Sequence, residues 1–90
     1  MARVSSPDSF RRPRPTIYNE GASTVSVGVR VHSDGVTTTL LVLAPGESQP
    51  VSAPRDGTVE VYTRDGSATA LAADGPSFSV RDGRVLVAPE

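Results

Sequence analysis

Apolar and polar residues alternate along much of the chain. The clearest run places a valine at every second position, at Val25, Val27, Val29 and Val31. Because successive side chains of a β-strand point to opposite faces, this pattern predicts a strand with one buried side and one solvent-facing side. The same alternation recurs at Val59 and Val61 and again at Phe78 and Val80. These apolar positions form the predicted core.

Turn signals separate the alternating runs. Five of them are Asp-Gly pairs: Asp34-Gly35, Asp56-Gly57, Asp65-Gly66, Asp74-Gly75 and Asp82-Gly83. Asp-Gly is typical of type I′ hairpin turns, since glycine adopts positive φ freely and aspartate tolerates it. The last four pairs are separated by about one strand each, so they predict consecutive hairpins of a meander.

Eight short segments fit strands between these turns. They are residues 16–19, 24–32, 36–43, 49–53, 58–63, 67–72, 77–80 and 84–88. Short strands at this spacing predict an all-β fold, a small antiparallel β-sandwich of seven or eight strands, Ig-like or jelly-roll-like. We expect one such domain over residues 16–90.

The first fifteen residues differ from the rest. They contain three prolines and no apolar periodicity, which favours extended backbone over a helix or a paired strand. They also hold four arginines and one aspartate, whereas residues 16–90 hold five arginines and nine acidic residues. Residues 1–15 are therefore predicted to be an extended basic arm on a mildly acidic body.

Two segments are apolar on both faces, around Leu40 and Val42 and around Leu86 and Ala88. One face of a strand in an antiparallel sandwich normally meets solvent, so we expect another subunit, or the arm, to cover these faces, and these four residues are candidates for a subunit interface. The alternative is that the ends of these strands are buried on both sides at a corner of the sandwich. Both interpretations stay open at this point.

The sequence offers little for catalysis or for cofactor binding. His32 is the only histidine, and we expect it on the solvent face of its strand without the partners that a catalytic triad requires. The aspartates are explained by their turns, and no loop has the spacing of a calcium site. With no cysteine and no glycine-rich phosphate loop, we expect no catalytic residue, no metal site and no cofactor.

The arm carries the one concentrated patch of charge. Arg11, Arg12 and Arg14 lie among prolines and next to Phe10. Arginines on a stiff extended segment can bind carboxylates or phosphates, but base-stacking aromatic residues are scarce here, because we expect tyrosines 18 and 62, which fall in predicted strands, to lie in the core. We expect these four residues to dock on a protein partner and not on nucleic acid; the alternative is a tail without function.

Several stretches carry a family resemblance. Residues 17–21, 24–27, 43–48 and 57–62 read IYNEG, TVSV, LAPGES and GTVEVY. In this order the chain, over residues 16–66, resembles the immunoglobulin-like β-sandwich domains of haloarchaeal surface proteins and virion proteins. The resemblance implies a sandwich fold and a use in an assembly.

A functional expectation follows from the arm, the size and the uncovered apolar faces. All nine cationic residues are arginine, which is typical of a GC-rich genome such as that of a haloarchaeon or an actinomycete. The longest apolar run has five residues, far short of the ~20 that span a bilayer, and no apolar stretch follows the first arginines as in a signal peptide.

We therefore expect a non-enzymatic, homo-oligomeric component of a tailed-virus particle, in its capsid decoration, turret or tail, that contacts other capsid or tail proteins. The expected location is the virion, with the cytoplasm as the alternative. The alternative function is an Ig-like module that binds a cellular protein or a carbohydrate.

Overall fold

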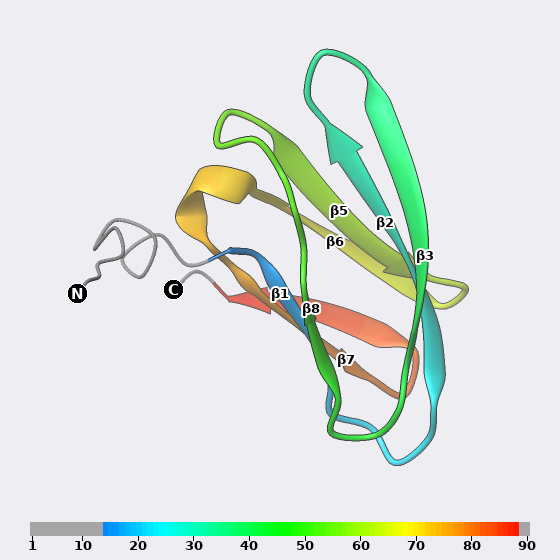
Figure 1. The fold of residues 1–90 in the computed structure, drawn as a ribbon. Coiled ribbons are helices and arrows are strands. Elements are labelled where there is room, and N and C mark those ends of the chain that lie inside the picture. Colours follow the sequence, from blue (N-terminus) through cyan, green and yellow to red (C-terminus); the bar gives the residue numbers. More distant parts are fainter. Residues whose placement is uncertain (1–13, 89–90) are drawn as a thin grey trace, which may run out of the picture.

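The computed structural model describes residues 14–88, which form two four-stranded β-sheets packed face to face (Figure 1). The predicted all-β sandwich is confirmed. Its strands are β1 (Thr16–Asn19), β2 (Val25–His32), β3 (Val36–Leu43), β4 (Ser48–Pro50), β5 (Thr58–Thr63), β6 (Gly66–Leu71), β7 (Ser77–Arg81) and β8 (Arg84–Ala88). A short 3-10 turn, Ala72–Asp74, connects β6 to β7.

The sheets have the strand orders β4-β1-β7-β8 and β3-β2-β5-β6. Every neighbouring pair is antiparallel except β1 and β7, which run parallel. The chain passes from one sheet to the other four times, between β1 and β2, between β3 and β4, between β4 and β5, and between β6 and β7. Each sheet is therefore built from segments that are distant in the sequence.

In two of the five Asp-Gly pairs, both residues have positive backbone φ. Asp82 and Gly83 have φ of 53° and 82° and close the β7–β8 hairpin, as the type I′ prediction requires. Asp34 and Gly35, at 53° and 122°, lie in the longer connection between β2 and β3. At these sites the sequence signal for a hairpin is confirmed.

The prediction of four consecutive hairpins is wrong at Asp56-Gly57 and at Asp74-Gly75, where the chain crosses from one sheet to the other. Asp56-Gly57 leads into β5 from a strand of the opposite sheet, and Asp74-Gly75 ends the 3-10 turn that carries the chain back. Gly75 adopts the left-handed conformation there, with φ 56° and ψ 47°. Asp-Gly thus marks a reversal in chain direction in each case, but a reversal serves a crossing between sheets as well as a hairpin.

The core lies between the sheets and consists of the alternating residues named above. Val59, Val61 and Phe78 are 0% exposed, and Val80 is 1% exposed. They pack in one cluster with Ile17, Val27, Val29, Leu43, Val51, Ala72 and Val85. The expectation that tyrosines 18 and 62 also lie in the core is wrong, because both project from the outer faces of their sheets.

Asn19 is the buried polar residue of the core, at 2% exposure. Its Nδ2 donates hydrogen bonds to the carbonyl oxygens of Ser23 (2.8 Å) and Leu43 (2.9 Å), while its Oδ1 accepts one from the backbone N–H of Gly21 (2.9 Å). One side chain therefore connects the end of β1, the β1–β2 loop and the end of β3.

The sandwich is closed along one side and open along the other. On the closed side β6 packs against β8, although the two strands belong to different sheets. On the opposite side, β3 and β4 are the edge strands, and a hollow of about 330 Å³ lies between β3 and residues 49–54. We call the surface formed by residues 36–54 the open side.

Candidate interaction surface

β3 presents uncovered apolar side chains. On its outer face, Val36 is 60% exposed, Leu40 76% and Val42 66%, whereas Leu43 on the inner face is 2% exposed. Alternation of the strand explains the difference, since every second side chain points away from the core. For Leu40 and Val42, the alternative that a corner of the sandwich buries both faces is therefore wrong.

Strand β3 is also an unprotected edge. It pairs with β2 over all eight residues, from Val36 opposite His32 to Leu43 opposite Val25, and its other edge has no strand beside it in the described chain. Edge strands are usually blunted by charge, proline or short length, because their free N–H and C=O groups accept a further strand. β3 has none of these features.

The other edges are blunted in these ways. β4 has three residues and contains Pro50, β8 begins with the charged Arg84, and β6 packs against β8 of the opposite sheet. β3 is therefore the edge of residues 14–88 that remains able to accept a strand.

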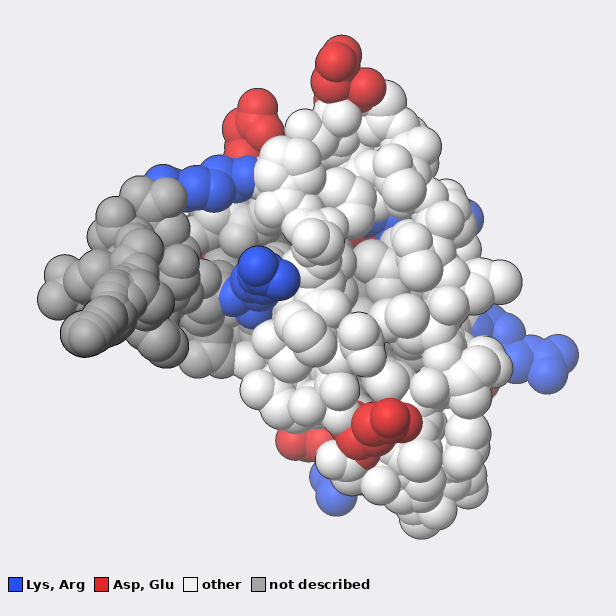
Figure 2. All heavy atoms as spheres, viewed as in Figure 1, with Lys and Arg blue, Asp and Glu red and all other residues white. Residues whose placement is uncertain are grey.

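The open side is almost free of charge. Within residues 36–54 the only charged residue is Glu47, and its Oε1 accepts a hydrogen bond from the backbone N–H of Ala44 within its own loop (2.8 Å). Figure 2 shows a continuous area without acidic or basic side chains over the region through which β3 runs in Figure 1. The hollow beside β3 is likewise lined by uncharged residues. This surface therefore offers a charged ligand a single carboxylate, which is already hydrogen-bonded within its own loop.

Neither a protein-family model, nor a curated protein, nor a solved structure matches this chain.

On the outer face of the same sheet, the ring of Tyr62 covers β2, the strand next to β3. A Cβ atom placed on Gly28 of β2 would lie 2.1 Å from Cζ of Tyr62, so the ring rests directly on the glycine backbone. The guanidinium carbon of Arg30 lies 4.2 Å from the centre of the same ring, within the range of cation–π attraction. Tyr62 thereby extends the apolar surface of Leu40, which pairs across the sheet with Gly28.

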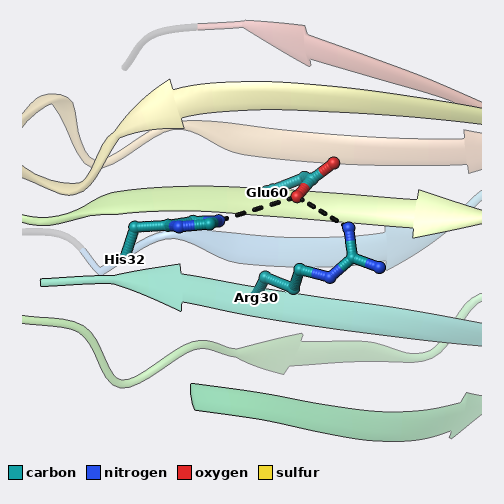
Figure 3. Close-up of polar contacts among 3 residues, drawn as sticks. All are labelled: Arg30, His32 and Glu60. Atoms are coloured by element: carbon teal, nitrogen blue, oxygen red, sulfur yellow. Dashed lines mark hydrogen bonds and ion pairs between the residues drawn. The ribbon is translucent and has the colours of Figure 1, made fainter. Parts of the chain in front are cut away.

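A small charged cluster completes this outer face (Figure 3). Arg30 Nη1 lies 3.1 Å from Glu60 Oε1, and His32 Nε2 lies 3.7 Å from the same oxygen. His32 is exposed at the end of β2, as predicted. The side chains of Arg30 and His32 are 42% and 45% exposed, so the surface ion pair contributes at most about 1 kcal/mol to stability.

The four predicted interface residues lie on two different faces. Leu40 and Val42 share the outer face of the β3-β2-β5-β6 sheet, whereas Leu86 (66% exposed) and Ala88 lie on β8 of the other sheet, beyond the core. Tyr18 is 40% exposed on that second sheet. The structure therefore brings the residues together in two pairs, and not in one patch.

The arm enters the structure at its last two residues. Arg14 is exposed, and its carbonyl oxygen accepts a hydrogen bond from Thr16 Oγ1 (3.0 Å). Pro15 is buried, and its carbonyl oxygen accepts a hydrogen bond from the N–H of Val51 (2.7 Å). The other three docking candidates, Phe10, Arg11 and Arg12, lie outside the described residues.

Two features are absent from residues 14–88. These residues contain no group of three or more His, Asp or Glu side chains that could hold a metal ion. The same part of the chain has no helix with the length and apolarity to cross a bilayer.

The contact between Tyr62 and Gly28 escaped sequence reasoning. A signal was present, because Gly28 interrupts the polar side of a strand whose other outward positions carry side chains. Glycine inside a strand often marks a place where another group approaches the backbone closely. The sequence does not say which aromatic residue makes that approach, since β2 and β5 are far apart in the chain.

Proposed function

We propose that this protein is a non-enzymatic structural component of a larger protein assembly. One observation supports this proposal above the others: an eight-residue edge strand without charge or proline, whose outward Leu40 and Val42 are largely exposed. Exposed apolar area of this kind marks contact surfaces, because it costs free energy to leave it in water. The second pair, Leu86 and Ala88, adds a contact on the opposite face.

The proposed assembly is a tailed-virus particle of a haloarchaeon or an actinomycete, in which the chain serves as a capsid-decorating, turret or tail protein. The sequence features that support it are the basic arm, the arginine-only cationic set, the small size and the resemblance to immunoglobulin-like domains of virion proteins. In this proposal the arm anchors the domain on a neighbouring protein, and the open side makes lateral contacts.

The partner of the arm is proposed to be protein. The arginines of the described body are dispersed around it in Figure 2, and Arg30 is paired with Glu60. A nucleic-acid surface would gather several unpaired cations in one groove. A carbohydrate site would gather aromatic rings, but the tyrosines 18 and 62 belong to different sheets.

Neutralising the arm tests the anchoring role. Changing Arg11, Arg12 and Arg14 to serine in the full chain is expected to remove the charge-assisted contacts that hold the arm on its partner. The measurement is the share of the protein that co-sediments with large particles from the source organism, compared with the unaltered chain. We expect this share to fall by about tenfold, as for a loss of ~1.4 kcal/mol of binding free energy.

The matched control removes three arginines from the body. Arg55, Arg64 and Arg84 are all exposed, so changing them to serine gives the same change in net charge without touching the arm. This variant is expected to stay with the particles. If the unaltered protein sediments only as a small species, or if both variants behave alike, the proposed anchoring is wrong.

A further inference from the structure

We infer that two copies of this chain associate through their β3 edges, in antiparallel orientation, and so form one continuous eight-stranded sheet across a two-fold axis. The inference rests on the proposed function, because it names the first partner in the assembly as a second copy of the same chain. It is carried by the backbone chemistry of the edge together with the neutrality of the open side.

The edge requires an extended strand as its partner. Every second residue of an edge strand points its backbone N–H and C=O away from the neighbouring strand, and another strand satisfies these groups at the usual spacing of about 4.8 Å. A second copy supplies a strand of the same length, since β3 has eight residues and is uninterrupted. The β3 strand of the second copy has the same free edge, so one contact between the two copies satisfies both strands.

The side chains are compatible with this self-pairing. When two β3 strands pair with their outer faces on the same side, Leu40, Val42 and Val36 of one copy lie opposite or diagonal to those of the other or to the Thr38 side chains. Apolar and threonine cross-strand pairs of this kind stabilise a sheet. No like charges oppose each other, because β3 has no charged residue.

Neutrality selects a second copy over a foreign peptide. A peptide that binds by adding a strand gains its specificity from pockets that take its alternate side chains. The hollow beside β3 is lined by uncharged residues, so it does not select a charged peptide. Here the only charged residue of the open side, Glu47, is hydrogen-bonded within its own loop. A second copy of the chain presents an open side that is equally neutral, so it matches this surface.

The test is sedimentation equilibrium of the purified full chain over a wide range of concentration. A single monomer–dimer equilibrium is expected. Leu40→Glu places a carboxylate in the apolar pairs of both copies at once, and is expected to raise the dissociation constant of the dimer by about tenfold or more. Leu71→Glu is the matched control, since Leu71 is exposed on β6 at the opposite edge of the same sheet, at 56% against 76%, and it should leave the dissociation constant unchanged. Leu86→Glu tests whether the second proposed contact, on the other sheet, makes the dimer instead.

A second variant covers the case in which Leu40→Glu does not fold, which circular dichroism would reveal. Thr38 is exposed and pairs across the sheet with Arg30, so Thr38→Glu gains a favourable neighbour within the monomer while it still puts a charge into the dimer contact. It is also expected to weaken the dimer by about tenfold.

Three results would overturn the inference. They are a monomer at every concentration, open-ended aggregation, and a dimer that Leu86→Glu dissociates but the β3 variants do not. A monomer that still co-sediments with large particles would overturn this inference alone, whereas a β3-dependent dimer absent from such particles would overturn the proposed function alone.

Discussion

Replacement of Phe78 by alanine is expected to lower the free energy of unfolding by about 3–5 kcal/mol, the range found for deletion of a buried aromatic side chain. Phe78 is 0% exposed and lies on β7, between β1 and β8 in its sheet. It is one of the two phenylalanines of the chain, and the core around it is built mostly from valine.

The consequence for this small domain is severe. Native domains are stable by only about 5–15 kcal/mol, and a chain of this size buries a smaller fraction of its surface than larger ones. Urea unfolding followed by circular dichroism measures the effect. Leu71→Ala, at a position 56% exposed, is the control and should change stability by less than ~0.5 kcal/mol. A loss below ~1 kcal/mol for Phe78→Ala would contradict the assignment of the core.

Replacement of Asn19 by alanine is expected to cost about 3 kcal/mol, through lost hydrogen bonds and not through lost apolar contact. The change removes the partner of three backbone groups at once, which are the N–H of Gly21 and the carbonyl oxygens of Ser23 and Leu43. Buried backbone groups without partners lose the hydration that they had in the unfolded chain.

Asn19→Asp separates this cause from a change of shape. Aspartate has nearly the same size but, when ionised, donates no hydrogen bond and faces two carbonyl oxygens. When protonated it can donate one. Its loss of stability relative to the unaltered protein is therefore expected to shrink as the pH is lowered, in urea unfolding at neutral and acidic pH. An equal loss at both pH values would show that the hydrogen bonds are not the cause.

Much of the fold could be predicted because local chemistry determines it. The strands Thr16–Asn19, Val36–Leu43, Thr58–Thr63 and Arg84–Ala88 match the predicted ranges residue for residue. In each, period-two alternation or a β-rich composition is bounded by turn residues on both sides. Exposure of the apolar faces at Leu40 and Leu86 was one of two interpretations that the sequence left open, and the structure decides for it over burial at a corner of the sandwich.

The failures have non-local causes. Asp65-Gly66 was expected to occupy the centre of a hairpin turn, but the turn is formed one residue earlier by Arg64 and Asp65, and Gly66 begins β6 opposite Thr63. Pairing across the sheet fixes this register. Tyr62 was assigned to the core because aromatic residues usually lie there, whereas the bare backbone of Gly28 offers its ring a flat apolar surface on the outside.

In the proposed assembly, the open side, with β3 at its edge, is buried. Amide hydrogen exchange read by mass spectrometry tests it most directly, by comparing the dilute free chain with the same chain in particles isolated from its source. We predict that residues 36–43 exchange markedly more slowly in the particle, because their free edge becomes paired. Equal exchange of residues 36–43 in both states, with protection confined to other segments, would contradict the account.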